Sequence, residues 1–294
     1  MASRLKDGFD RQWITDNAIE ICQQYDLGIL TLRGLHYQLV SRGMTNSVQH
    51  YKRVVKAIIK ARRDGIIAYA QFSDHDREMI GETNAEATDV NDAIEEGKDQ
   101  ICAWMEMYSK NRWENQPRYV ELWIEKKALQ GVFSPICKSN DIALCPCKGY
   151  PSLTFLHDAA GRFLDAVCRS QQPMIVYFGD HDPSGEDIPR SICKNLLCDF
   201  GADVDVQVIA LTENQCLELD LPPAPVKTTD SRSAGFTGLG QIELDAVRPE
   251  ILQQWAVKSI ESNFDEDLYA ELLDAESSER EQYQDALRKY TAKL

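Results

Sequence analysis

The pattern of apolar and polar positions divides the chain into a helical first part and an alternating second part. In the first part, apolar residues recur at helical spacing, and Thr31 and either Asn46 or Ser47 stand where helices are capped. A short apolar run follows the Asp64-Gly65 turn and is typical of a strand. Helices are expected over 13–25, 31–41 and 47–63, and a strand over 66–70. This order of elements predicts a winged helix-turn-helix domain over residues 1–72.

Beyond residue 117, short apolar runs rich in β-branched and aromatic residues alternate with helical patterns. Strands are expected over 118–124, 142–144, 174–178 and 204–210, and helices from 125, over 152–168, 186–197, 249–263 and 267–290. This alternation predicts a mixed α/β fold with a parallel, Rossmann-like sheet over residues 118–294 and helices at its C-terminal end. Residues 211–240 are expected to form a loop, because Pro222, Pro223 and Pro225 favour an extended chain. An acidic linker with a helix over about 90–108 is expected in residues 73–117.

Composition narrows the class of protein. The 294 residues suffice for two domains, and 43% apolar with 27% charged residues is typical of a soluble globular protein. No apolar run approaches the length of a membrane span, and the N-terminus has no signal-peptide pattern. The nine cysteines lack the paired spacing of a zinc site, which favours reduced thiols in a cytoplasmic protein.

Positive charge is concentrated in one stretch of an acidic chain. The formal net charge is −15, yet residues 31–63 contain no Asp or Glu. A local basic stretch of this kind favours contact with the phosphates of double-stranded DNA, although a solvated basic helix face is the plainer alternative. The residues expected to contact DNA are Arg42, Lys52, Arg53, Lys56, Lys60, Arg62 and Arg63, with Lys148, Lys227 and Arg232 from the second domain.

Three carboxylates follow predicted strands. Asp180 and Asp182 lie in the motif GDHDPSG directly after the apolar strand at 174–178, and Glu125 follows the strand at 118–124. Because neighbouring parallel strands end at one edge of a sheet, these side chains are expected to converge there. Carboxylate oxygens are the ligands that Mg²⁺ prefers, with Mn²⁺ as a substitute. The alternative is an ordinary turn, since Asp, Pro, Ser and Gly are all turn formers.

Several motifs together resemble a known family. They are Thr31-Leu32-Arg33-Gly34-Leu35-His36-Tyr37, Ile124-Glu125-Lys126, Lys148-Gly149-Tyr150-Pro151 and Asp180-His181-Asp182-Pro183-Ser184-Gly185, with a further likeness over 221–232. Their order resembles the A subunit of topoisomerase VI and the related meiotic double-strand-break transesterase, across residues 10–250. The length, and the lack of an ATPase module, look most like the free-standing Mini-A type of mobile elements.

The resemblance implies a winged helix that carries a nucleophilic tyrosine and a Toprim domain that binds Mg²⁺. By position, Tyr37 matches the tyrosine, Arg33 the arginine before it, and Glu125, Asp180 and Asp182 the metal carboxylates. The chain departs from the family at Gly34, where an Asp is common, and at His36, where Tyr or Phe is common.

A tyrosine at position 37 needs help to act as a nucleophile. The pKa of a phenol is near 10, so little phenolate exists at neutral pH. Arg33, one helical turn earlier, is expected to favour the phenolate, with His36 beside it. The function predicted is therefore Mg²⁺-dependent DNA cleavage by tyrosine transesterification, as in a type IIB topoisomerase A subunit. A homodimer is expected because duplex cleavage requires two tyrosines; the family implies that one subunit's tyrosine works with the other's metal site.

Alternatives from other classes remain open. Tyr37 could be an ordinary packed tyrosine, and Tyr51 is a second candidate for contacting the DNA backbone. Toprim carboxylates could instead activate water in a hydrolytic nuclease, and a non-catalytic DNA-binding protein or a ligand-sensing regulator are weaker alternatives. The sequence has no phosphate-binding glycine loop followed by Lys-Ser or Lys-Thr, so ATP binding by this chain is not expected; a separate ATPase subunit is neither indicated nor excluded. A nucleoid-associated protein, encoded by a phage or another mobile element, would fit this interpretation.

Overall fold

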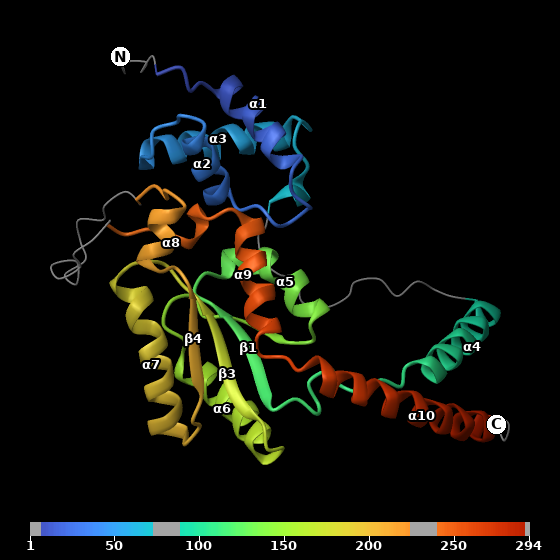
Figure 1. Ribbon diagram of the computed structural model, residues 1–294. Coiled ribbons are helices and arrows are strands. Elements are labelled where there is room, and N and C mark those ends of the chain that lie inside the picture. The colour runs from blue at the N-terminus through green and yellow to red at the C-terminus, as the bar shows by residue number, and fades with distance from the viewer. Residues whose placement is uncertain (1–6, 73–88, 224–239, 292–294) are drawn as a thin grey trace. The chain divides into compact units, whose positions relative to one another are not determined.

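The chain divides into two units. A computed structural model describes residues 7–72, 89–223 and 240–291 (Figure 1). One unit comprises Met1–Arg77 and Tyr119–Asn263, and the other comprises Glu78–Arg118 and Phe264–Leu294. All nine cysteines are free thiols. Across the described ranges, no helix is both long and apolar enough to cross a membrane.

Three helices open the first unit, as the sequence predicts. They are α1 (Arg11–Cys22), α2 (Leu32–Ser41) and α3 (Val48–Arg63). Each begins at a side-chain cap that accepts a hydrogen bond from the first turn, provided by Asp10, Thr31 and Ser47 respectively. The helices bury one apolar cluster, in which Leu30, Leu35, Leu39, Val54 and Ile58 are fully enclosed. Capping and periodicity place α2 and α3 to within one residue, whereas α1 begins two residues and ends three residues earlier than predicted.

The strand expected over 66–70 does not form. The segment ends instead in a 3₁₀ turn, Tyr69–Gln71, and its only pairing among the described residues is a single bridge between Leu30 and Phe72. Ile66 and Tyr69 are exposed, and only Ile67 of the apolar run is buried. An apolar run without a neighbouring strand gains no ladder hydrogen bonds, so hydrophobicity alone misled the prediction. The described residues give a three-helix domain without the predicted wing.

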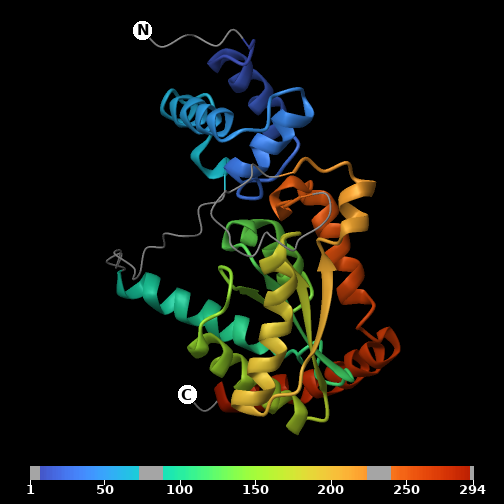
Figure 2. The same ribbon diagram turned by 90° about the vertical axis from the view of Figure 1, so that its left-hand side faces the viewer.

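A four-stranded parallel sheet forms the second part of this unit, which confirms the predicted α/β class. Its strands are β1 (Arg118–Ile124), β2 (Ala143–Pro146), β3 (Gln172–Phe178) and β4 (Asp205–Ala210), in the order β2-β1-β3-β4. The helices are α5 (Gln130–Ser139), α6 (Leu153–Cys168), α7 (Pro183–Phe200) and α9 (Pro249–Glu261). Helices α6 and α7 cover one face and α5 and α9 the other, and Figure 2 shows α7 and α9 on opposite sides of β4.

The strand order places a topological switch point between β1 and β3. The connection from β1 runs outward to β2, and the connection from β3 runs outward to β4. In open α/β sheets the crevice beyond the carboxyl ends of two such strands is where ligands bind. Glu125 directly follows β1 and Asp180 lies two residues beyond β3. The sheet therefore positions the predicted carboxylates at its most favourable edge.

Part of the region predicted as a loop is helical. Helix α8 (Glu213–Glu218) begins at Thr212, whose side chain and that of Gln215 form a reciprocal capping box. The motif Thr-x-x-Gln signals this start, and the nearby prolines masked it in the sequence interpretation. Residues 224–239, with the predicted DNA contacts Lys227 and Arg232, lie outside the described residues. Two further 3₁₀ turns, Lys127–Leu129 and Leu244–Ala246, flank the site described below.

The second unit pairs α4 (Val90–Glu106) with α10 (Glu266–Thr291). Its core is small: the Trp113 and Phe264 rings pack edge to face at 5.1 Å, and Leu272 is buried. Glu276 accepts a hydrogen bond from the backbone N–H of Lys110 at 2.7 Å. The predicted segment 73–117 thus contributes α4, and the last predicted helix packs with it. Both helices begin and end within two residues of their expected bounds.

Candidate active site

Helix α2 carries Arg33 and Tyr37 one turn apart. Its cap, Thr31, accepts a hydrogen bond from the Gly34 N–H and donates one to Asp245 Oδ1, both at 2.8 Å. The Arg33 guanidinium donates from Nη1 to both carboxylate oxygens of Glu243, each at 2.8 Å. Two residues from a segment 210 positions later in the chain thus hold the start of the helix that carries the predicted nucleophile. In this chain, where Gly34 replaces the acid common in the resembled family, Glu243 is the carboxylate beside Arg33.

The Tyr37 side chain is buried in the protein and is not exposed to solvent. It is 2% exposed, and its hydroxyl makes no hydrogen bond of ordinary geometry to any described residue. Burial raises its pKa to about 12 and Glu243 adds to that rise, whereas Arg33 and Lys126 lower the pKa. The effect of Arg33 therefore has the predicted sign but is outweighed by desolvation. In this arrangement the phenol stays protonated.

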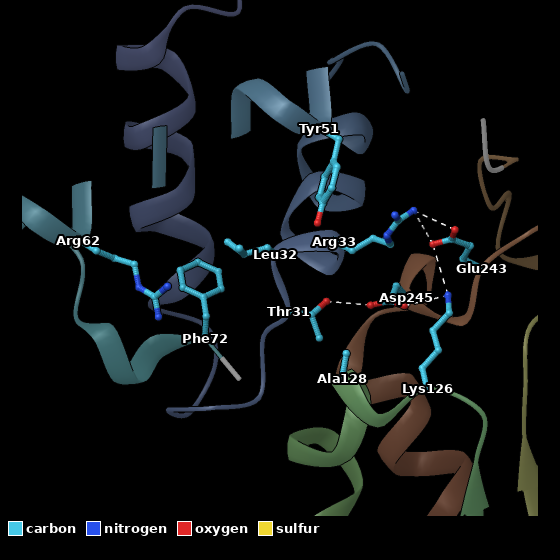
Figure 3. A pocket seen from close by; sticks show the side chains of 10 residues that line it. All are labelled: Thr31, Leu32, Arg33, Tyr51, Arg62, Phe72, Lys126, Ala128, Glu243 and Asp245. Atoms are coloured by element: carbon cyan, nitrogen blue, oxygen red, sulfur yellow. Dashed lines mark hydrogen bonds and ion pairs between the residues drawn. The ribbon is translucent and has the colours of Figure 1, made fainter. Parts of the chain in front are cut away.

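Tyr51 is the more accessible tyrosine of the site. The Arg33 guanidinium carbon lies 5.0 Å from the centre of its ring, within cation–π range. Figure 3 shows its hydroxyl directed into a pocket of about 470 Å³. The pocket is lined by Thr31, Leu32, Arg33, Tyr51, Arg62, Phe72, Lys126, Ala128, Glu243 and Asp245. A small ligand or one nucleotide fits this volume, with guanidinium, ammonium and aromatic groups around it.

His36 is a second buried polar side chain of α2. It is 3% exposed, and neither ring nitrogen makes a hydrogen bond of ordinary geometry within the described ranges. Burial lowers its pKa to about 4; Arg33 and His50 lower it further, while Asn46 and Glu243 oppose the shift. The imidazole is therefore neutral at pH 7. It cannot supply the positive charge beside Tyr37 that a charged histidine would.

Two of the three carboxylates predicted to bind metal, Glu125 and Asp180, meet at the sheet edge. The Asp180 N–H donates to Glu125 Oε2 at 2.9 Å, and the Glu125 N–H donates to the Phe178 carbonyl at 2.8 Å. Burial raises the pKa of Glu125 to about 7, with the charges of Asp180 and Asp182 adding to the rise. Asp182 caps α7 by accepting from the Gly185 N–H at 2.7 Å. The strand ends thus bring Glu125 and Asp180 together, and Asp182 lies near enough for its charge to raise the pKa of Glu125.

Two glycines of the GDHDPSG motif make this approach possible. A Cβ at Gly185 would lie 2.0 Å from the Asp180 carbonyl oxygen. A Cβ at Gly179 would lie 2.6 Å from the Tyr177 ring and 2.9 Å from Glu125 Oε2. A larger residue at position 185 would push against the Asp180 backbone, and one at position 179 would displace the Tyr177 and Glu125 side chains. The glycines are therefore part of the site and not merely turn formers.

Lys126 is the central residue that sequence reasoning did not identify. Its ammonium lies 3.0 Å from Asp180 Oδ2, 3.1 Å from Asp245 Oδ2 and 3.3 Å from Glu243 Oε2. These carboxylates raise the pKa of Lys126 against the opposing effect of its burial, so it stays charged. Lys126 appears in the sequence only as the neighbour of Glu125. Glu243 and Asp245 carry a clearer signal, because they repeat the one-residue spacing of Asp180 and Asp182.

The site has suitable oxygen donors for a hard cation but is not arranged as a chelate. Within the described ranges, no three His, Cys, Asp or Glu side chains are grouped so as to hold a metal ion. The oxygens of Asp180 are engaged by Lys126 and by the Leu244 N–H at 2.8 Å, and Asp182 is engaged as a helix cap. The all-carboxylate donor set fits Mg²⁺ in type. In this arrangement Lys126 supplies the positive charge.

The predicted DNA-contacting residues that the structure describes lie in several different places. Lys52, Lys56, Lys60 and Arg63 follow one outward stripe of α3, because its other face is buried through His50, Val54, Ala57, Ile58 and Ala61. Arg42 and Arg53 are paired with Glu20 and Asp7 at 2.6 and 2.7 Å, and Lys60 pairs with Asp64. Arg62 instead turns toward the pocket and lies over the Phe72 ring at 5.4 Å. Lys148 is exposed beyond β2.

The arrangement can bind and polarise an anion beside a carboxylate cluster. Arg33 and Lys126 present charged donors to one point, the Tyr37 and Tyr51 phenols belong to the same helical domain, and Glu125 lies next to Lys126 in sequence. Such a combination suits the chemistry of a phosphate ester. A scan against protein-family models and a search of the curated proteins both find no match for this chain.

Proposed function

We propose that the protein cleaves duplex DNA by Mg²⁺-dependent tyrosine transesterification, with Tyr37 as the nucleophile. One observation carries the proposal: Arg33, one turn from Tyr37, meets Lys126 of the sheet edge at a shared carboxylate, Glu243. The residue predicted to assist the nucleophile and the edge that carries the predicted metal carboxylates are therefore neighbours in one unit. The winged-helix and Toprim assignments rest on the resemblance of motifs alone, and the strand expected over 66–70 does not form among the described residues.

In the proposed reaction the Tyr37 oxygen forms a bond to a DNA phosphorus. The phosphorus–oxygen bond to the adjoining sugar breaks, the phenolic proton leaves, and the sugar oxygen takes up a proton to become a free hydroxyl. Arg33 holds a non-bridging phosphate oxygen and favours the phenolate. Mg²⁺, held by Glu125, Asp180 and Asp182, would supply positive charge that stabilises the transferring phosphoryl group. One phosphate ester replaces another, so reversal reseals the strand without ATP.

A homodimer is part of the proposal. Each tyrosine cleaves one strand, and a break in a duplex needs two, which two copies related by a twofold axis provide. Tyr37 is buried and protonated in the arrangement described above. Cleavage therefore requires that α2 separate from Glu243, so that the phenol becomes exposed. While α2 separates from Glu243, the outward stripe of α3 would contact the backbone of the duplex.

The test is to incubate the protein with supercoiled plasmid and Mg²⁺, stop the reaction with SDS, and analyse the DNA with and without protease. We expect cleaved DNA that migrates freely only after protease, that is lost with EDTA, and that is lost in Tyr37→Phe. Tyr69→Phe is the matched control, because it removes an exposed hydroxyl of the same domain, and Tyr51→Phe tests the other phenol of the site and should still form the adduct. Loss of the adduct in Tyr51→Phe but not in Tyr37→Phe would assign the nucleophile to Tyr51 and refute this proposal.

A hydrolytic nuclease is the second candidate, and the burial of Tyr37 favours it. A phenol with a pKa near 12 and no hydrogen bond of ordinary geometry within the described ranges is poorly prepared for attack. The same carboxylates could then direct a water molecule. Nicked or linear DNA that migrates identically with and without protease, in the wild type and in Tyr37→Phe alike, would identify hydrolysis.

A further inference from the structure

Glu243 occupies a position between two cationic side chains. The Arg33 guanidinium bonds both of its oxygens at 2.8 Å, and the Lys126 ammonium lies 3.3 Å from Oε2. Figure 3 shows the carboxylate between these two groups at one side of the pocket. The cations come from different parts of the chain, α2 and the end of β1, and they point at the same anion.

The backbone around Glu243 fixes the carboxylate in place. Ile242 forms a two-way backbone bridge with His181, at 2.9 and 3.0 Å. Leu244 donates its N–H to Asp180, and Asp245 accepts from Thr31. Residues 242–245, here called the acidic strap, are thus bound on both sides of Glu243. The carboxylate is held against Arg33 and Lys126 by its neighbours as well as by charge.

A guanidinium and an ammonium that converge on one point form a general oxyanion site. Arginine bonds carboxylate and phosphate with the same paired geometry, and lysine serves both as a point charge. The pocket beside the pair adds Arg62 and the Tyr51 hydroxyl to its lining. More than one carboxylate surrounds Lys126, whereas Glu243 is the acid that bonds Arg33 directly. If Glu243 were displaced, Arg33 would lose its carboxylate partner, whereas Lys126 would keep Asp180 and Asp245.

We infer that Arg33 and Lys126 form a binding site for a DNA phosphodiester, and that Glu243 occupies this site in the absence of DNA. The inference rests on the proposed function, because it takes the substrate to be DNA. The inference adds that Glu243 competes with DNA for Arg33, so a DNA phosphate must displace Glu243 before it reaches Arg33. Release of the acidic strap from Thr31 and Arg33 would also loosen α2, which carries Tyr37.

The experiment measures DNA binding without cleavage. A fluorescein-labelled duplex of 25 base pairs is titrated with protein in EDTA, and anisotropy gives the dissociation constant. Glu243→Gln keeps the shape of the side chain and removes its charge, and we expect it to bind about fivefold more tightly, as for the loss of one half-exposed ion pair. Glu213→Gln is the matched control, since it makes the same change on an exposed helix of the same unit. It should bind within about twofold of the wild type, because an isolated exposed charge contributes little.

A second pair of variants tests the route through Arg33. In an Arg33→Gln background, Glu243→Gln should bring less than about a twofold gain, because the competitor and its target are coupled. An equal gain in both backgrounds would mean that Glu243 acts by general repulsion, and weaker binding by Glu243→Gln would mean that it orients Arg33 for DNA. Either result overturns the inference. Should Glu243→Gln fail to fold, Glu243→Asp withdraws the carboxylate by one methylene and should give a smaller gain of the same sign.

The two proposals fail separately. Equal affinity of wild type, Glu213→Gln and Glu243→Gln, with a protease-sensitive adduct still formed in Mg²⁺, would reject the competitor and keep the transesterase. Tighter binding by Glu243→Gln without an adduct in any variant would keep the competitor and reject the transesterase.

Discussion

Two glutamates of the same strand region, one buried and one partly buried, have opposite surroundings. Glu121, within β1, is fully enclosed, and its oxygens accept from Arg162 at 2.7 and 3.0 Å, from the Tyr119 hydroxyl at 2.9 Å and from the Trp123 Nε1–H at 2.9 Å. Glu125, just beyond the strand, has the Asp180 N–H and faces the like charges of Asp180 and Asp182. The charge of the buried Glu121 is compensated by several donors, whereas the partly buried Glu125 has fewer donors and faces like charges.

The difference teaches where to look for function. A buried carboxylate with a bidentate guanidinium and two further donors is a structural element, because its desolvation is offset locally. A partly buried carboxylate among other carboxylates destabilises the fold, because its desolvation and the repulsion between like charges are not offset. Groups perturbed in this way are concentrated at functional sites. The same contrast recurs in the helical domain, where His50 bonds Ser47 and Asp7 while His36 has no comparable partner within the described ranges.

The largest effect should come from breaking the compensated site. Arg162→Leu leaves the Glu121 charge buried without its cation, and we expect the free energy of unfolding to fall by about 3 kcal/mol. Urea denaturation followed by tryptophan fluorescence measures this change. Arg190→Leu is the control, since Arg190 pairs with Asp187 at the exposed surface and should cost less than about 0.5 kcal/mol. Equal losses in the two variants would show that the Glu121 site is not specially dependent on its arginine.

A smaller effect should appear on acidification through His36. Its pKa is about 4 in the folded protein, against about 6.5 in an unfolded chain. Because the unfolded state binds the proton first, His36 stabilises the fold fully above pH 6.5, and this contribution is lost as the pH falls toward 4. The loss amounts to about 2 kcal/mol by pH 5, from the two pKa values.

The measurement compares His36→Phe with the wild type in urea at pH 7.5 and at pH 5. We expect the stability of the variant relative to the wild type to improve by about 2 kcal/mol between the two pH values. Other groups that titrate in this range cancel in the comparison. His50→Gln retains His36 and should keep that part of the acid sensitivity, so an identical change in both variants would refute the assignment.

The sequence predicts the helices and strands around this site better than it predicts which side chains meet there. Caps at Thr31 and Ser47 and the apolar runs of β1 and β3 locate the helices and the sheet edge, because these signals are local. The meeting of Glu125 with Asp180 also follows from parallel topology alone. Lys126 could not be assigned, because its role arises from contacts with residues as far as 117 positions away, and the spacing of Glu243 and Asp245 does not reveal which cations they meet. The failure of the strand expected over 66–70 has the same cause, since a strand requires a distant partner that an apolar run does not reveal.

The smallest effect is expected at two tyrosines, Tyr119 and Tyr37, whose hydroxyls differ in hydrogen bonding. Tyr119 donates to Glu121, whereas the Tyr37 hydroxyl is buried and has no ordinary hydrogen bond to the described residues. Removing a hydrogen-bonded hydroxyl leaves its acceptor without a partner, which destabilises the fold. Removing a buried hydroxyl that has no partner stabilises the fold, because that hydroxyl no longer has to be desolvated. We therefore expect Tyr119→Phe to lose about 1 kcal/mol of unfolding free energy and Tyr37→Phe to gain up to about 1 kcal/mol. Urea denaturation at pH 7.5 tests both. A loss in Tyr37→Phe would mean that its hydroxyl finds a partner in solution, and the phenol would then be better prepared for attack than its burial indicates.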